Sequence, residues 1–242
     1  MRALPWVLAA TCLIVAAAQA QDPTQQWTLP ASGVLHGSKA VVENQPCCGP
    51  SRNTRVNNPD TATLAKLGGM AMRDGRKLTL KLADNRSLTL TDCDEQSGCE
   101  ADNTRIHRLV SWLPQHRLHV VAVGLYEESV AYLVSERDGR TLLVTAPPVL
   151  SPSGRKAVAL VSNLMSGVDL EVIDLDRNPP TVGKITTMPD CSGAGPNSFL
   201  RPIPVWTDES HVTFEGESPL PEDKSNAKQL LRVEGGKGQW QC

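Results

Sequence analysis

Apolar and polar residues alternate along residues 77–91. Every second residue from Leu78 to Leu82 is a leucine, and after the polar stretch Asp84-Asn85-Arg86 the alternation resumes with Leu88 and Leu90. A period of two places the leucines on one face of a strand. The polar break between the two runs is typical of a turn. The pattern therefore predicts a hairpin with one buried face.

Short apolar runs recur through the rest of the chain. We expect further strands at residues 118–123, 130–134, 142–144, 157–161, 170–174, 182–186, 212–214 and 230–233. Glycine, proline and aspartate separate these runs, and Asp138-Gly139 is a typical hairpin turn. Strands that recur every ~8–12 residues favour an all-β sandwich, barrel or propeller.

The N-terminal region has a different pattern. Residues 21–60 are rich in proline, asparagine, glycine and serine, with one apolar core at 40–42, so we expect loops and an isolated strand. A helix is expected over residues 60–72, capped at Asp60 or Thr61 and interrupted by Gly68-Gly69. We therefore predict a loop-rich segment over residues 21–75, packed on a β domain over residues 76–242.

The first twenty residues are typical of a secretory signal peptide. Arg2 gives a positive start, an uncharged apolar run follows from Trp6 to Ala18, and Ala18-Gln19-Ala20 is a small-x-small cleavage site. The run is shorter than the ~20 residues of a transmembrane helix, and no later segment approaches that length. We expect cleavage after Ala20, no transmembrane span, and a periplasmic or secreted protein.

Cleavage would remove Cys12 and lower the seven cysteines of the chain to six. In an oxidising compartment these predict disulfides, for which fifteen pairings are possible. A short polar loop favours Cys93–Cys99, and the terminal Cys242 is expected to pair with Cys191. Cys47 and Cys48 then form a vicinal pair, or one of them bonds elsewhere and the other pairings change. The alternative for Cys47-Cys48 is a soft metal or redox site.

Composition and motifs narrow the classes of function. The net charge of −2 and the 4% aromatic residues argue against nucleic acid as a partner. No Gly-x-Ser-x-Gly, His-Glu-x-x-His or P-loop motif occurs. We therefore expect neither catalytic residues nor a cofactor. A metal site using His107, His116 and His119 is the alternative, and a solvated basic hairpin face is the interpretation we prefer.

One stretch has the strand-turn-strand pattern of a repeated unit. Residues 148–161 form a strand, a Ser-Pro-Ser-Gly turn at 151–154 and a returning strand, and a third strand follows at 170–175. This unit resembles the WD-like repeat of TolB-type β-propellers, in which a Ser-Pro-Asp-Gly turn joins the inner strands of each blade. Ser153 stands where that aspartate is usual. Weaker copies begin near residues 110 and 205, spacings of roughly 40 and 55 residues.

The resemblance implies a small or irregular β-propeller-like domain, stapled by disulfides. The mature chain has room for about five blades of ~40 residues, and three are detectable. A β-sandwich of short antiparallel strands is the alternative. The repeated motif is a structural turn and implies no catalytic residues, because binding in such propellers occurs on their faces.

These observations predict an exported, monomeric, non-enzymatic binding module that contacts another cell-envelope or secreted protein. We expect the long connections 191–199 and 217–226 to form the contact surface. The contrasting hypothesis is a metal-binding or redox protein that uses Cys47/Cys48 or the histidine region.

Overall fold

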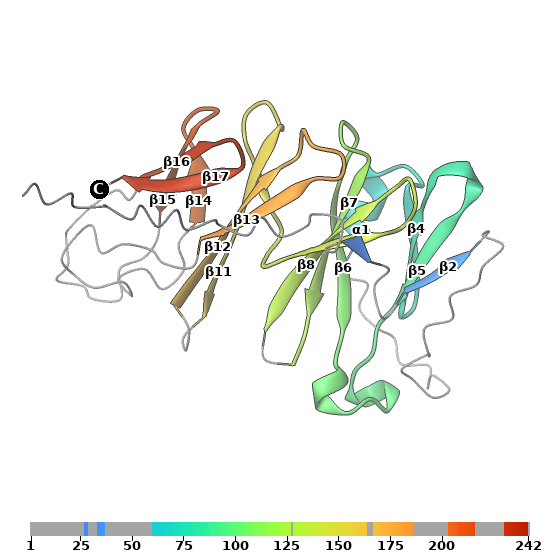
Figure 1. Cartoon of the computed structure of the whole chain (residues 1–242). Helices are drawn as coiled ribbons and strands as arrows, with labels where there is room; N and C mark the ends of the chain where they lie inside the picture. The colour runs from blue at the N-terminus through green and yellow to red at the C-terminus, as the bar shows by residue number, and fades with distance from the viewer. Residues whose placement is uncertain are drawn as a thin grey trace, which may run out of the picture.

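The computed structural model describes residues 27–28, 33–36, 60–126, 128–163, 167–185, 203–215 and 230–241 (Figure 1). These residues form four antiparallel sheets and one short α-helix, so the all-β prediction is confirmed. No helix in these ranges has the length and apolar character to cross a membrane. The expected signal peptide, Cys47, Cys48, Cys191, Cys242 and the loops 191–199 and 217–226 lie outside the described residues.

The first sheet contains the hairpin that the leucine pattern predicts. Its strands, in the order β2-β5-β4-β3, are β2 (Gly33–His36), β3 (Ala71–Asp74), β4 (Lys77–Lys81) and β5 (Ser87–Thr91). The hairpin pairs Lys77 with Thr91 and Lys81 with Ser87. The 3-10 helix η2 (Ala83–Asn85) forms its turn. Because β3 pairs with β4, a boundary at residue 75 would pass through this sheet, and the expected domain division stays a prediction.

The second sheet has the order β1-β9-β8-β7-β6. Its strands are β1 (Trp27–Thr28), β6 (Ile106–Leu113), β7 (Leu118–Gly124), β8 (Ser129–Ser135) and β9 (Thr141–Val144). The sequence pattern predicts β7, β8 and β9. In β6 the pairing register shifts between Leu109 and Ser111, so that a bulge at Val110 breaks the alternation that would have marked the whole strand.

The third and fourth sheets are simple meanders in chain order. The third contains β10 (Val149–Leu150), β11 (Lys156–Asn163), β12 (Gly167–Asp174) and β13 (Thr181–Ile185). The fourth contains β14 (Ile203–Trp206), β15 (His211–Glu215), β16 (Leu230–Glu234) and β17 (Lys237–Gln241). In the part of the chain that the structure describes, no strand pairing joins one sheet to another.

The expected helix over residues 60–72 is shorter than predicted. Helix α1 spans Thr61–Lys66, and β3 already begins at Ala71. Gly68 and Gly69 both have positive φ angles, of 54° and 90°. This backbone conformation suits glycine and cannot continue a right-handed helix. The two glycines therefore end the helix rather than interrupt it.

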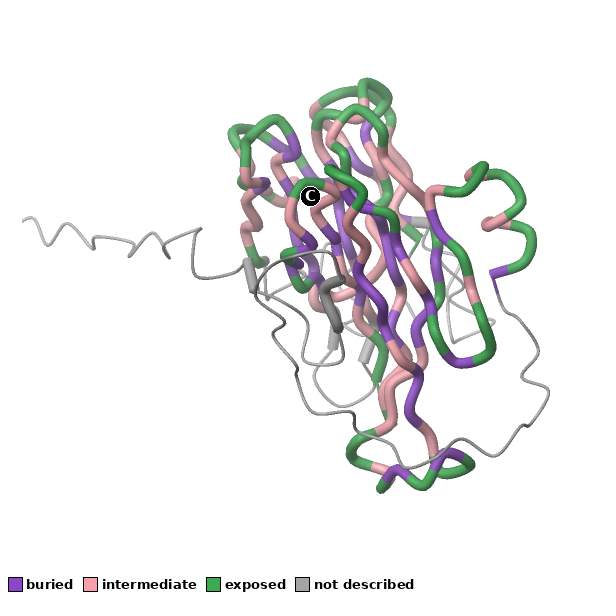
Figure 2. Tube along the Cα trace, turned by 90° about the vertical axis from the view of Figure 1, so that its right-hand side faces the viewer, coloured by how far each residue is buried: buried purple, intermediate pink, exposed green. Residues whose placement is uncertain are grey.

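The core consists of three apolar layers between successive sheets. One layer lies between the first and second sheets, one between the second and third, and one between the third and fourth. Strand β7 contributes to two of them, since Val121 packs toward the first sheet and Val120 toward the third. Figure 2 shows the buried residues along the strands and the exposed residues in the turns. The four sheets thus stack in chain order, and the middle two are covered on both faces.

A disulfide links Cys93 and Cys99, the pair that the short polar loop favours, with their Cα atoms 5.9 Å apart. The loop between them holds the 3-10 helix η3 (Glu95–Ser97), and a further 3-10 helix, η4 (Ala101–Asn103), follows. Asp94 and Ser97 cap η3 reciprocally. Asp94 also forms an ion pair with Arg76 at 2.6 Å. Asp94 thus stabilises the conformation of this loop.

Candidate functional site

A buried ionic network lies between the first and second sheets. Arg73 on β3 forms ion pairs with Asp60 at 2.6 Å and with Asp92 at 2.7 Å. Asp92 accepts hydrogen bonds from the backbone N–H and the Nδ1 of His107, at 2.8 and 2.9 Å. All four side chains are between 0% and 3% exposed. The network is closed to solvent, and we assign it a structural role in joining the start of α1 to both sheets.

The three histidines close together in the sequence do not meet in space. His107 pairs with Val123 across β6 and β7, whereas His119 is opposite Trp112 near the other end of the same strand pair. His107 binds Asp92, His119 approaches the Lys81 carbonyl, and His116 approaches the Gly154 carbonyl. Among the described residues, no group of three or more histidine, cysteine or acidic side chains has the arrangement of a metal site. The metal and redox hypothesis for Cys47 and Cys48 stays a prediction.

His119 should make the stability of the protein depend on pH. Burial lowers the pKa of His119 below its ordinary value of 6.5, although the hydrogen bond to Lys81 and the charge of Glu136 oppose the shift. Its buried Nδ1 has no hydrogen-bond partner among the described residues. The unfolded chain therefore takes up the proton at a higher pH than the folded protein, and stability falls as the pH drops below 6.5.

Urea denaturation at several pH values between about 4.5 and 7.5 measures this effect. Relative to the wild type, His119→Gln should flatten the loss of stability below pH 6.5, because glutamine can still donate to the Lys81 carbonyl without titrating. Identical pH profiles for the two proteins would show that His119 does not protonate on unfolding.

Two constellations look catalytic and are not. Asp208, Ser210 and His211 lie in one turn, but the serine hydroxyl and the carboxylate both approach His211 Nδ1, at 3.4 and 2.8 Å. A proton relay needs the two groups on different ring nitrogens. Ser153, three residues before Lys156, donates its hydroxyl to Glu209 at 2.6 Å. That hydrogen bond joins a turn of the third sheet to one of the fourth. Lys156 donates instead to the backbone carbonyls of Glu209 and Val233, so it does not act as a base on Ser153.

A pocket lies where turns of the second and third sheets meet. Antiparallel meanders bring alternate turns to the same end of a sheet. Four such turns, at 114–117, 136–140, 153–155 and 175–180, surround a cavity of about 600 Å³. Its lining comprises Gln115, His116, Arg117, Leu118, Ser135, Arg137, Asp138, Arg140, Arg155, Leu175, Asp176, Arg177, Asn178, Pro179 and Pro180. We call this the arginine-lined pocket.

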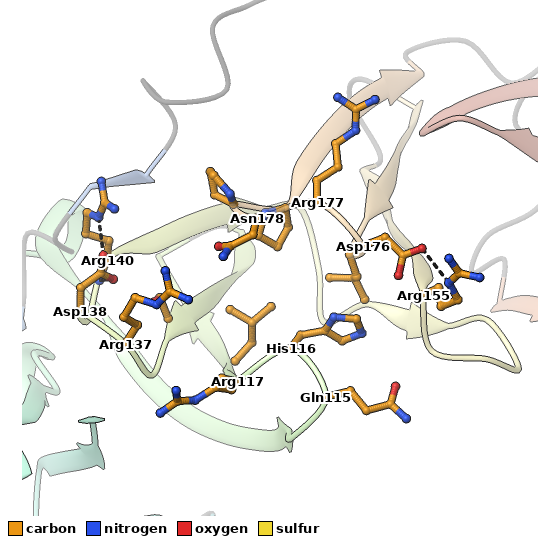
Figure 3. Close-up of a pocket in the computed structure, with 15 residues that line it drawn as sticks. Gln115, His116, Arg117, Arg137, Asp138, Arg140, Arg155, Asp176, Arg177 and Asn178 are labelled. Atoms are coloured by element: carbon orange, nitrogen blue, oxygen red, sulfur yellow. Dashed lines mark hydrogen bonds and ion pairs between the residues drawn. The ribbon is translucent and has the colours of Figure 1, made fainter. Parts of the chain in front are cut away.

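Five arginines stand around this pocket against two aspartates. In Figure 3, Arg117, Arg137 and Arg140 lie on one side and Arg155 and Arg177 on the other, with His116 and Asn178 between them. The arginines come from two different sheets, so the stacking of the sheets, rather than local sequence, brings these guanidinium groups to one pocket.

Carboxylates hold four of the five guanidinium groups in place. The ion pairs are Arg117–Glu136 at 2.9 Å, Arg140–Asp138 at 2.8 Å, Arg155–Asp176 at 2.6 Å and Arg177–Asp174 at 3.2 Å. The hydrogen bond from Arg117 lowers the pKa of Glu136, so this carboxylate stays ionised. The four arginine side chains remain 53–67% exposed and keep N–H groups for a ligand.

Arg137 differs from the other four. Within the described ranges, no carboxylate contacts its guanidinium group, and the residue is exposed. Its backbone carbonyl accepts a hydrogen bond from Arg86, which ties the turn to the first sheet. Arg137 is therefore a positive group held at the pocket by its backbone and available to an anion.

A second, smaller pocket adjoins the first. It has a volume of about 370 Å³ and is lined by Trp112, Leu113, Pro114, Gln115, His116, Leu150, Ser151, Pro152, Ser153 and Gly154. Gln115 and His116 belong to both pockets. The His116 Nε2–H donates to the Gly154 carbonyl at 2.7 Å and so joins the two turns between the pockets. We call this second cavity the proline-lined pocket.

The sequence does not single out these arginines. Each is an ordinary charged residue in a polar turn, and Arg117 and Arg177 are 60 positions apart in the numbering. The sequence feature that could have predicted the pocket is the recurrence of arginine in four turns, because a meander of strands places these turns at the same end of the sheets. Recognising it requires the stacking order of the sheets as well as the strand pattern.

Comparisons with models of protein families, with curated proteins and with solved structures find no match for this chain.

Proposed function

We propose that the protein is an exported, non-enzymatic binding module and that the arginine-lined pocket receives an anionic group of its partner. The observation that carries the proposal is the meeting of five arginines, from four turns of two sheets, around one cavity. Arginine presents a planar fork of donors that matches carboxylates and related anions. The partner is a cell-envelope or secreted protein, and the module acts as a monomer.

Export is supported by the leader-like first twenty residues and by the Cys93–Cys99 disulfide, since disulfides persist mainly in oxidising compartments. We place the protein in the periplasm or outside the cell, with cleavage after Ala20. The intact mass of the protein recovered from the exported fraction tests this. A mass that begins at Gln21 supports export, and a mass that retains Met1 contradicts it.

We further propose that the four sheets are the blades of a small, irregular propeller. The third and fourth sheets are meanders of four strands in succession, as in propeller blades, and the second contains such a meander in β6 to β9. The stacking of the four sheets in chain order fits that architecture better than a two-layer sandwich. The arginine-lined pocket then lies between two blades, on the side formed by their turns. Turns held in place by a rigid β-scaffold are common sites of binding, so a ligand is expected on this face.

Binding of fluorescently labelled poly-L-glutamate tests whether the arginine-lined pocket takes anions. We expect binding that weakens with added salt. The double variant Arg137→Glu, Arg177→Glu should lose at least about tenfold in affinity, because two positive groups at the pocket become negative. The control is Arg232→Glu, which reverses an exposed arginine on β16, outside the pocket.

The control should change affinity by less than about twofold. Equal losses in the control and in the double variant would mean that poly-L-glutamate senses net charge alone, and the proposal would be wrong. Melting temperatures close to that of the wild type would show that each variant is folded.

A further inference from the structure

The arginine-lined pocket and the proline-lined pocket differ in chemistry and share a wall. The first is surrounded by exposed guanidinium groups. The second is walled by Trp112, Leu113, Leu150 and two exposed prolines, Pro114 and Pro152. His116 stands between them, fixed by its hydrogen bond to the Gly154 carbonyl. A ligand that covers both pockets must therefore carry negative charge and an apolar group side by side.

The charges around the first pocket favour carboxylates over phosphates. Asp138 and Asp176 line the same cavity, and their arginine partners lie 2.8 and 2.6 Å away. Arg140 and Arg155 thus each form an ion pair with a singly charged carboxylate. A phosphate monoester carries about two negative charges at neutral pH, and the two aspartates would repel the second charge. A singly charged planar carboxylate has the better match.

The arginines are also spread rather than focused on one point. Figure 3 shows them on both sides of the cavity. Several carboxylates spaced along a chain match this distribution better than one compact anion. An extended peptide supplies both features, since acidic side chains and a neighbouring large apolar side chain can emerge from the same short segment.

Resting on the proposed function above, we infer that the partner presents an acidic peptide segment, with carboxylates in the arginine-lined pocket and an adjacent large apolar side chain in the proline-lined pocket. Leu, Met or an aromatic residue suits the second cavity, whose volume is about 370 Å³. The carboxylates orient the peptide and make its affinity depend on salt concentration. Burial of the apolar side chain slows the dissociation of the peptide.

Selection from a displayed library of random peptides, each of about 12 residues, tests this inference on the oxidised mature protein. Enriched peptides should contain several Asp or Glu residues next to a Leu, Met or aromatic residue. Affinities of the best peptide are then measured by fluorescence anisotropy for the wild type and for three variants. These are Arg137→Glu with Arg177→Glu, Pro114→Asp with Pro152→Asp, and the control Arg232→Glu.

We expect a loss of at least about tenfold for the arginine double variant, about fivefold for the proline double variant and less than twofold for the control. Replacing the apolar residue of the peptide by serine should cost the wild type about fivefold and the proline variant nearly nothing, because that variant no longer offers the apolar cavity.

The outcomes separate the inference from the proposed function. Acidic peptides that lose affinity with the arginine variant, but are indifferent to the proline variant and to the serine replacement, leave the proposed function standing and overturn the two-pocket inference. Enriched peptides that bind all variants equally overturn both. Vesicles of anionic phospholipid, or polyphosphate, that displace the peptide from the arginine-lined pocket with higher affinity would overturn the choice of a peptide carboxylate.

Discussion

Replacing Arg73 by leucine is expected to lower the free energy of unfolding by about 3–5 kcal/mol. Arg73 forms ion pairs with both Asp60 and Asp92. These carboxylates are 0% and 3% exposed, so water cannot replace the guanidinium group. The substitution leaves two buried negative charges together and also removes a donor to the His107 carbonyl.

Urea denaturation of Arg73→Leu beside the wild type measures this loss, and the melting temperature should fall by roughly 10 °C. Arg108→Leu is the matched control, since Arg108 is an exposed arginine on β6 and its replacement should change stability by less than about 0.5 kcal/mol. A triple variant that adds Asp60→Asn and Asp92→Asn should recover part of the loss. Equal stabilities for Arg73→Leu and Arg108→Leu would contradict the buried network.

Replacing Gly183 by alanine is the second large effect, with an expected loss of about 2 kcal/mol. Gly183 lies on β13, and a Cβ atom there would stand 2.7 Å from the carbonyl oxygen of Gly236. Gly236 belongs to the turn between β16 and β17. Because the neighbour is backbone, the two sheets must move apart locally to make room.

Gly124→Ala is the control for this prediction. Gly124 is also a strand glycine, and a Cβ atom there would lie 3.9 Å from its nearest neighbours, atoms of Ile106. Alanine at this position should stabilise the protein by about 0.5 kcal/mol, because it reduces the freedom of the unfolded chain. In thermal melts, the melting temperature should fall for Gly183→Ala and rise for Gly124→Ala. A Gly183→Ala protein as stable as the wild type would mean that the third and fourth sheets are not in close contact there.

Strand positions follow from sequence wherever one face is buried. The hairpin of β4 and β5 has this property, and its leucines mark it clearly. Strand β17 (Lys237–Gln241) was not predicted, because Trp240 is its only large apolar residue. Strand β6 was obscured by the bulge at Val110, which shifts the phase of the side chains.

Closeness in sequence was a poor guide to the candidate functional site. His107, His116 and His119 lie within one short stretch, yet the strand pair between them directs each to a different partner. Conversely, Arg117 and Arg177 are far apart in the chain and line one pocket. Strand geometry separates the three histidines, and the stacking of sheets brings the two arginines together. A single sequence carries information about strand geometry but not about the stacking of sheets.

The Ser-Pro-Ser-Gly turn illustrates what a local motif can and cannot predict. It does join β10 to β11 as expected, with Gly154 at a φ angle of 73°. Its contacts with Glu209 and with His116 are long-range, and they link this turn to the fourth and second sheets. The motif thus fixes the turn, while its place beside both pockets depends on the rest of the fold.

Hydrogen exchange measured by mass spectrometry, with and without saturating poly-L-glutamate, tests the central claim most directly. The arginine-lined pocket as an anion-binding site predicts slower exchange in the turns 114–117, 136–140, 153–155 and 175–180, and unchanged exchange in the β16–β17 turn. Protection that is absent from these four turns, or that is concentrated on the fourth sheet, would contradict it.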